Sequence, residues 1–326
     1  MKARTAILCG AAAVLSGCEG SPSFFYPGSP GVEVTRHIGT IIFLICGGIF
    51  LLVATLLVAS IVRFRGRPEH VAKRIYGNWK LELLWTAVPA FILAYMFGLS
   101  MKGMSLDRPP SPNTLPVSVV ARQWWWGVQY PGTGVDTANE IHVPTGREVR
   151  VTLTSLDVIH SFWVPQLSGK TDVIPGRTAY QAFLAAKAGS YVGECAEFCG
   201  VEHGHMDFLV VAESPERFSE WMRRQQSPAR EPKTPGAVAG KRKFLALPCM
   251  GCHAVRGTPA AGTLGPDLTH VASRRSIAAG TLPNGVASLA RWVADPQADK
   301  PGNKMPDLHL PPDTVRELAE YLGGLD

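Results

Sequence analysis

The chain has 326 residues, 46% of them hydrophobic, and its 32 basic and 26 acidic side chains leave a formal net charge of +6. This length predicts about two domains. The positive excess is modest, and no basic patch interleaved with aromatic residues occurs, so the composition does not indicate a nucleic-acid-binding protein. The 7 cysteines are an odd number, and the last four form two close pairs. Such pairs with histidines nearby favour ligand or attachment sites over a disulfide framework.

Residues 1–18 have the layout of a secretory signal, with Lys2 and Arg4 ahead of an apolar stretch. The stretch ends in "LSGC", which resembles a bacterial lipobox, in which the cysteine, here Cys18, is acylated and becomes the first residue. The alternative is an ordinary signal peptide that is cut at a nearby small residue. Either interpretation predicts an exported protein, and lipidation would add an anchor.

Residues 19–105 are predicted to form a transmembrane hairpin. Two apolar runs, at about 38–62 and about 82–100, are long enough to cross a bilayer as helices, and Pro89 is tolerated inside a membrane helix. The short segment between the runs is rich in Arg and Lys, so the positive-inside rule places it in the cytoplasm. Both ends of the hairpin then lie outside, which agrees with an exported N-terminus.

Residues 106–226 change character, because β-branched and aromatic runs alternate there with Pro/Gly turns. The pattern predicts a compact antiparallel β-sandwich or barrel, closed by a helix at 215–226. Alternation along a strand predicts that Trp125 is buried and that Trp124 and Trp126 are exposed.

The Pro-rich segment 227–240 is expected to be a linker, and residues 241–326 have the patterning of a helical domain. In the last helix three apolar residues recur at helical spacing, and Asp313 or Thr314 is expected to cap it. The apolar face consists of Val315, Leu318 and Leu322.

The two exported domains differ in charge. Residues 116–230 contain ten basic and twelve acidic side chains, a net −2, whereas residues 241–326 contain ten basic and eight acidic ones, a net +2. Opposite signs favour contact between domains that a linker holds at high effective concentration.

The densest group of potential metal ligands is "CAEFCGVEHGHM", residues 195–206. Its ligand-type side chains, spaced four, four and three residues apart, are Cys195, Cys199, His203 and Met206. Thiolates and imidazoles favour copper or zinc, and thioether sulfur favours copper. A structural zinc site normally has two separate ligand pairs and no methionine, although zinc or a redox-active thiol pair stays an alternative. A second histidine must come from elsewhere, and His160 ends a predicted strand of the same domain.

The segments "IHSFWVPQLSGKTDVIPGR" and "YVGECAEFCGVEHGHM" resemble subunit II of the haem–copper cytochrome c oxidases. The resemblance extends over the hairpin and "RQWWWGVQY". It implies a cupredoxin-like Greek-key β-barrel that binds CuA, a dinuclear, mixed-valence copper centre. By this resemblance both cysteines bridge the two copper ions, each histidine binds one ion, and a methionine and a backbone carbonyl are weak ligands. The residues concerned are Cys195, Cys199, His160, His203, Met206 and Glu197.

The resemblance also implies three further roles. The Glu197 side chain would bind magnesium or manganese at the boundary with subunit I, Trp124 would be the point where electrons enter, and Glu82 would lie at the mouth of a proton path into subunit I. The alternatives are a surface carboxylate, a packing tryptophan, and an interfacial acid paired with Lys80 or a neighbouring arginine. His205 is expected to be solvated or to support a ligand.

The stretch "CMGCH" is the CxxCH signal for covalent attachment of c-type haem. The two cysteines would form the thioethers and the histidine would ligate iron; these residues are Cys249, Cys252 and His253. The sixth ligand must come later, and Met305 is preferred over its rivals His270 and His309. The pattern resembles the all-α class I cytochromes c, with "GPDL", residues 265–268, as the loop beside the histidine. Thioether ligation raises the reduction potential relative to two histidines.

Together the resemblances imply subunit II of an aerobic respiratory cytochrome c oxidase with a fused cytochrome c domain. Electrons would pass from an external donor, a soluble or membrane cytochrome c, through haem c, the Trp124 region and CuA to the haem of subunit I. Subunit I would reduce O2 to water and translocate protons, so the chain would be part of an oxidoreductase and translocase whose oxygen-reducing site lies in its partner.

The implied partners are subunits I and III, the electron donor and membrane lipid. The implied location is the bacterial inner membrane, with two spans and with both cofactor domains on the periplasmic or extracellular side. Two alternatives remain: the electron-input subunit of a nitric oxide reductase, and a free-standing periplasmic electron-transfer or copper protein.

Overall fold

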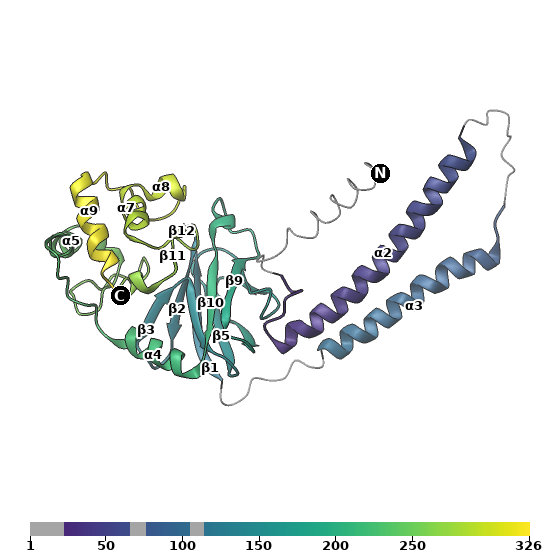
Figure 1. The fold of residues 1–326 in the computed structure, drawn as a ribbon, viewed down its shortest axis with the longest axis horizontal. Helices are drawn as coiled ribbons and strands as arrows, with labels where there is room; N and C mark the ends of the chain where they lie inside the picture. Colours follow the sequence, from purple (N-terminus) through teal and green to yellow (C-terminus); the bar gives the residue numbers. More distant parts are fainter. Residues whose placement is uncertain (1–22, 66–75, 105–113) are drawn as a thin grey trace, which may run out of the picture. The chain divides into compact units, whose positions relative to one another are not determined.

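The computed structural model describes residues 23–65, 76–104 and 114–326. The chain divides into two compact units, one of Pro30–Pro109 and one of Met1–Ser29 with Pro110–Asp326. The first is helical, and the second contains a β-rich part and a helical part (Figure 1). The predicted signal and lipobox at 1–18 lie outside the described residues.

The helical unit consists of α2, Pro30–Phe64, and α3, Trp79–Met104. Within the described ranges, these are the helices long and apolar enough to cross a membrane, and they contain the two predicted spans. Their apolar side chains are largely exposed, as expected for a surface that lipid rather than water would cover. The side chain of Asn78 accepts hydrogen bonds from the backbone of Lys80 and Leu81 and so caps α3.

Ten strands of the second unit form two five-stranded sheets. The first sheet has the order β3 (Val135–Ala138), β2 (Trp125–Tyr130), β1 (Leu115–Arg122), β5 (Glu148–Ser155) and β8 (Ala179–Leu184). The second has the order β4 (Glu140–Pro144), β10 (Phe208–Glu213), β9 (Gly189–Cys195), β6 (His160–Trp163) and β7 (Thr171–Val173). The cupredoxin-like fold that the resemblance implied is therefore present.

The expectation of a wholly antiparallel barrel is wrong for two strand pairs. Strand β1 pairs with β5 in parallel, and β4 pairs with β10 in parallel. Strands β1 and β5 are neighbours in the first sheet, and β4 and β10 in the second, although other strands separate the members of each pair in the chain. Sequence alternation identifies strands and their buried faces, but not the direction of a partner.

The core lies between the two sheets, where alternate residues of each strand point inward. In β5 the inward side chains Val149, Val151 and Leu153 have no solvent exposure. The ring of Trp126 makes edge contacts with Phe162 and Phe208, with centroids 5.7 and 5.3 Å away. Such contacts between buried aromatic rings stabilise the junction of the two sheets.

The predicted burial of the three tryptophans is reversed. Trp125 is half-exposed, whereas Trp124 and Trp126 are 8% and 0% exposed. The register pairs Trp126 with the buried Ala121, and β2 begins only at Trp125. Trp124 therefore lies in the preceding turn, where the alternation rule does not apply.

Two further segments complete the barrel. Helix α4, Pro215–Gln226, has the predicted bounds, and its Phe218 and Trp221 join the core. The N-terminal segment lies along the barrel as well: the N–H of Gly28 donates to the carbonyl of Gln166 at 2.7 Å, and its carbonyl accepts from the N–H of Ala186 at 2.8 Å. The hydroxyl of Ser29 donates to the Leu167 carbonyl at 2.7 Å.

The C-terminal part is built from short helices. They are α5 (Pro235–Ala246), α6 (Cys249–Cys252), α7 (Val286–Ala294), α8 (Pro296–Asp299) and α9 (Pro312–Gly323). The same part contains the 3-10 turn η2 (Val271–Ser273) and a two-stranded ribbon of β11 (Ser276–Ile277) and β12 (Leu282–Pro283). A further 3-10 turn, η1 (His203–His205), belongs to the barrel. Helices α5 and α9 cross at Gly240, where an added Cβ would lie 2.0 Å from the Glu317 carbonyl oxygen. Only glycine permits so close a crossing.

Two details of this part differ from expectation. Helix α5 begins at Pro235, inside the segment predicted to be a linker. The predicted cap of α9 is wrong, because the helix starts at Pro312, with Pro311 at the capping position and no side-chain cap. Proline suits the first helical position, since the missing N–H would have no intrahelical partner. The predicted apolar face is confirmed, because Val315, Leu318 and Leu322 are all buried.

Candidate metal centres

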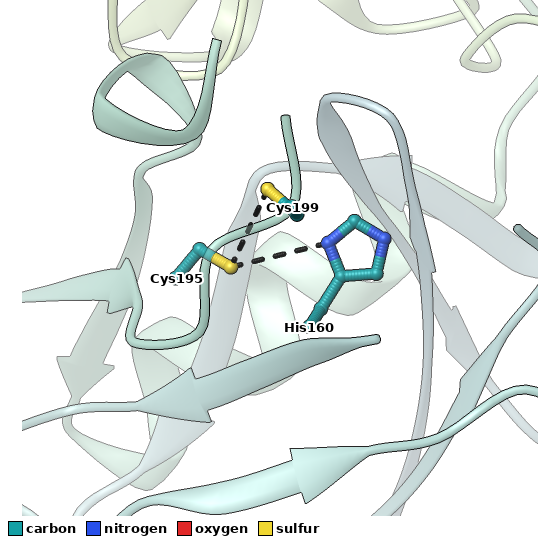
Figure 2. A group of neighbouring side chains, drawn as sticks. All are labelled: His160, Cys195 and Cys199. Carbon is teal, nitrogen blue, oxygen red and sulfur yellow. Dashed lines mark hydrogen bonds between the residues drawn. The ribbon is translucent and has the colours of Figure 1, made fainter. Parts of the chain in front are cut away.

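Strand pairing brings the separated copper-ligand candidates together. Strand β9 ends at Cys195 and pairs with β6, which opens at His160. The Cys195 sulfur lies 3.8 Å from the Cys199 sulfur and 3.9 Å from Nδ1 of His160, and all three side chains are buried (Figure 2). Each offers one ligand atom within 4.8 Å of the other two.

The loop after β9 supplies the remaining donors. The Cys199 sulfur lies 3.7 Å from Nδ1 of His203 and 3.8 Å from the sulfur of Met206. The Cys195 sulfur lies 3.3 Å from the backbone carbonyl oxygen of Glu197. The structure thus gathers the whole predicted set: two thiols, two imidazoles, one thioether and one carbonyl.

Hydrogen bonding orients the buried histidine. Nε2 of His160 lies 2.9 Å from the carboxylate of Asp157, which directs the other ring nitrogen toward Cys195. The same carboxylate accepts the backbone N–H groups of Gln123 and Val158. A carboxylate behind an imidazole fixes the tautomer and ring orientation of a metal ligand.

The two thiols are unequal in the absence of a cation. The hydrogen bond between the sulfurs lowers the pKa of Cys195 and raises that of Cys199. Burial and repulsion by the Cys195 thiolate, whose sulfur lies 3.8 Å away, raise the pKa of Cys199 further. A bound cation removes this repulsion, because metal ligation requires thiolates. This soft sulfur-rich donor set fits copper.

The haem-attachment residues lie on and after α6. Nδ1 of His253 lies 2.8 Å from the carbonyl oxygen of Pro266, in the predicted "GPDL" loop, which leaves Nε2 as the nitrogen for iron. A Cβ at Gly265 would lie 2.5 Å from this ring, so the loop approaches the histidine as only glycine allows. Burial lowers the pKa of His253 and favours the neutral imidazole, which is the ligating form.

The loop of the predicted sixth ligand is held from both sides. The backbone N–H of Met305 donates to the side chain of Asn303 at 2.8 Å, and its carbonyl accepts from Gln297 at 2.9 Å. The rivals are engaged elsewhere: His270 lies 3.0 Å from the carbonyl of Ser227, and the side chain of His309 is 87% exposed. The donor set at this site fits a haem with histidine and methionine ligands.

Comparison with known proteins follows the same division of the chain. Residues 23–102 match "Cytochrome C oxidase subunit II, transmembrane domain", residues 133–213 match "Cytochrome C oxidase subunit II, periplasmic domain", and residues 237–326 match "Cytochrome c". The cytochrome c oxidase subunit 2 of Alkalihalophilus pseudofirmus is 35% identical over 270 residues, which cover 80% of this chain and 77% of that protein. The chain belongs to the cytochrome c oxidase subunit 2 family.

A second cytochrome c oxidase subunit 2, from Bacillus sp. (strain PS3), is 34% identical over 284 residues, covering 81% of this chain and 79% of that protein. The periplasmic domain of subunit II of cytochrome oxidase from Bradyrhizobium japonicum is 30% identical and covers 36% of this chain and 97% of its own, with a TM-score of 0.35. Membership of this family agrees with a membrane-anchored subunit of an oxidoreductase complex, with copper in the barrel and haem in the cytochrome c domain.

Three other residues singled out in the sequence lie apart from the copper ligands' side chains. Glu82 is exposed in the first turn of α3, where its carbonyl accepts the hydroxyl of Thr86 at 2.9 Å. The Glu197 side chain is exposed, although its carbonyl faces the copper cluster. Trp124 is closer: its indole N–H donates to the carbonyl of Cys199 at 3.0 Å.

Sequence reasoning missed where the cytochrome c domain contacts the barrel, which is next to the segment that carries the candidate copper ligands. The backbone N–H of Asp207 donates to the Ala279 carbonyl at 3.1 Å. Lys300 is buried beside it, although lysine is normally an exposed residue. Lys304 adds a pair with Asp157 at 3.4 Å, and Asp157 in turn orients His160.

Proposed function

We propose that the chain is the electron-input subunit of an aerobic respiratory cytochrome c oxidase. It accepts electrons from an external donor at its cytochrome c domain and passes them through the barrel to subunit I. In this proposal, subunit I reduces O2 to water and translocates protons. The observation that carries the proposal is the convergence of six donor atoms, the sulfurs of Cys195 and Cys199 and four further soft or polar atoms around them.

The barrel's residues would hold the dinuclear CuA centre, which supplies one-electron transfer when bound. The residues that would hold it are Cys195, Cys199, His160, His203, Met206 and, through its backbone carbonyl, Glu197. The β-strand frame and the Asp157 hydrogen bond keep these side chains in place, and a site that changes little between oxidation states transfers electrons with small reorganisation. The tightly packed interior supports that rigidity.

The cytochrome c domain would hold one covalent haem c, which supplies a second one-electron centre when bound. Cys249 and Cys252 would attach the haem covalently, and His253 and Met305 would bind its iron. The Pro266 carbonyl keeps His253 in one tautomer. We assign this domain to residues 241–326 and the copper domain to residues 106–226.

Trp124 is the proposed point of electron entry into the barrel. Its indole N–H donates to the carbonyl of a bridging cysteine, Cys199, which supports this role. We further propose that Glu197 binds magnesium or manganese together with subunit I, and that Glu82 opens a proton path into subunit I.

The proposed setting is the bacterial inner membrane, with both cofactor domains on the periplasmic or extracellular side. Subunits I and III are the partners within the complex, and a cytochrome c is the donor. Cys18 is proposed to carry a lipid after signal cleavage.

Purification of the native complex tests the proposal. We expect two copper ions and one covalent haem c per chain, co-purification of subunit I, a near-infrared copper absorption band, and oxygen uptake with reduced cytochrome c. Zinc in place of copper, or a single copper ion, would contradict the site assignment. A complex that reduces nitric oxide but not O2 would contradict the reaction.

A further inference from the structure

Lys300 follows α8 in the cytochrome c domain and is only 2% exposed. Its ammonium nitrogen donates to the backbone carbonyls of Trp124 at 2.8 Å and Ala278 at 3.1 Å, and to that of His205. Two of these acceptors belong to the barrel, and the third belongs to the ribbon region of the cytochrome c domain. One side chain thus joins three separate segments.

The three acceptors use every hydrogen of the ammonium group, since the charged form of lysine has three donors and no acceptor. Burial lowers the pKa of Lys300 to about 8, and the carboxylates of Glu202 and Asp207 act against this shift. A buried ammonium is unfavourable unless it is fully hydrogen-bonded. The complete satisfaction of Lys300 therefore indicates a built contact rather than a chance approach.

The backbone after Lys300 leads directly to the predicted iron ligand. The side chain of Asn303 donates to the Lys300 carbonyl at 2.7 Å and accepts the N–H of Met305 at 2.8 Å. Between them, Gly302 has φ of +81°, and an added Cβ would lie 3.6 Å from the ring of Trp124. The loop that carries Met305 therefore rests on the Trp124 indole and is anchored at its start by Lys300.

Other contacts hold other parts of the same boundary. Arg256 donates to the Gly134 carbonyl at 3.1 Å and to the carbonyl of Gln225, and the backbone N–H of Arg275 donates to Glu140. These residues would keep the domains joined if Lys300 were changed. Loss of the Lys300 ammonium group should therefore loosen residues 300–305, the methionine loop, without separating the domains.

We propose that Lys300 is a positioning residue that fixes the methionine loop of the cytochrome c domain against Trp124. The inference rests on the proposed function, because Trp124 and Met305 matter as parts of an electron path. It makes the contact between the two redox domains a permanent one, whereas the opposite net charges alone would give a transient encounter.

The test is Lys300→Met in the full chain within the membrane complex, because methionine keeps an unbranched side chain and removes the donors. Leaving buried carbonyls without a donor should raise hydrogen exchange of residues 300–305 and of the Trp124 segment by about tenfold or more. Electron transfer from haem c to copper should slow by a similar factor. The near-infrared copper band should stay unchanged, since no copper ligand is altered.

The matched control is Lys304→Met, which changes an exposed lysine four residues away that pairs with Asp157. The Lys304 side chain is 70% exposed and lies 3.4 Å from the Asp157 carboxylate. An ion pair made by so exposed a side chain contributes little, so exchange and electron transfer should change by less than about twofold. Equal effects of the two variants, or wild-type exchange in Lys300→Met, would overturn the inference.

A measurement on the unaltered complex keeps the inference testable if Lys300→Met does not accumulate. Hydrogen exchange of residues 300–305 should be insensitive to added sodium chloride, because salt screens exposed charges much more than buried contacts. A steep rise with salt would show that surface charges hold the loop and would overturn the inference. Absence of the copper band in the unaltered complex would instead contradict the proposed function.

Discussion

In the barrel, the candidate copper ligands contact one another directly, and five of the six lie within one stretch of twelve residues, 195–206. In the cytochrome c domain, the candidate iron ligands come from segments far apart in the chain, and each is held by its own hydrogen bonds, His253 by Pro266 and Met305 by Asn303 and Gln297. Replacing one candidate copper ligand should therefore disturb the whole copper site, whereas each candidate iron ligand can be replaced without displacing the other.

The largest effect is expected at the centre of the copper cluster. Cys199 contacts another thiol, an imidazole and a thioether, so Cys199→Ser should abolish the near-infrared copper band. The haem c spectrum should remain, because its ligands lie in the other domain. Cys46→Ser, at an exposed cysteine in α2, is the control and should leave both spectra unchanged. Persistence of the copper band in Cys199→Ser would refute the ligand assignment.

Removal of the candidate sixth iron ligand should change the haem c spectrum and potential but should not release the haem. Met305→Leu should remove the thioether-to-iron charge-transfer band and lower the haem potential by on the order of 0.1 V, since thioether ligation raises the potential. The covalent haem should stay attached. Met250→Leu, within the attachment turn, should alter neither quantity. An unchanged potential in Met305→Leu would mean that another residue is the sixth ligand.

A smaller effect is expected behind the copper cluster. Asp157→Asn removes the charge that orients His160, so copper loss to a chelator should become about tenfold faster. The measurement is the decay of the near-infrared band after the chelator is added. Asp172→Asn, at an exposed acid on β7, should leave the decay at the wild-type rate. Equal decay rates in the two variants would mean that packing alone orients the histidine.

The smallest effect concerns stability away from both metal sites. Burial would lower the pKa of His142, but Glu140 and Glu213 raise it, and the net shift is upward. The stability that this histidine contributes is therefore fully present below about pH 6.5 and is lost as the pH rises through the raised pKa. The wild-type melting temperature should therefore fall as the pH rises through this range, and His142→Gln should make that fall smaller. The change in the free energy of unfolding should be on the order of 1 kcal/mol. The exposed His309→Gln should keep the wild-type profile.

The candidate copper ligands could be expected to lie together because metal chemistry restricts residue type and spacing, and a resemblance to a known pattern added His160 from a distant strand. The strand and helix segments followed from alternation and helical spacing. The prediction that Trp124 and Trp126 are exposed was wrong, because alternation gives the buried face only when the first residue of the strand is known. The parallel pairs β1–β5 and β4–β10 depend on which strands become neighbours, which local periodicity does not encode.

Lys300 could not be predicted for a related reason. A buried lysine requires acceptors, and its three acceptors are backbone carbonyls at Trp124, His205 and Ala278, which any residue type could supply. Backbone partners leave no trace in the side-chain pattern. The opposite net charges of the two domains predicted that they would meet, but not where.

The backbone bonds of Gly28 to Gln166 and Ala186 have a topological consequence. They require the chain before α2 and the barrel after α3 to be in the same aqueous compartment. The number of membrane crossings between them must then be even, which α2 and α3 together satisfy. The hydrogen bonds of this N-terminal segment to the barrel thus require an even number of membrane crossings, independently of the charges of the loop between α2 and α3.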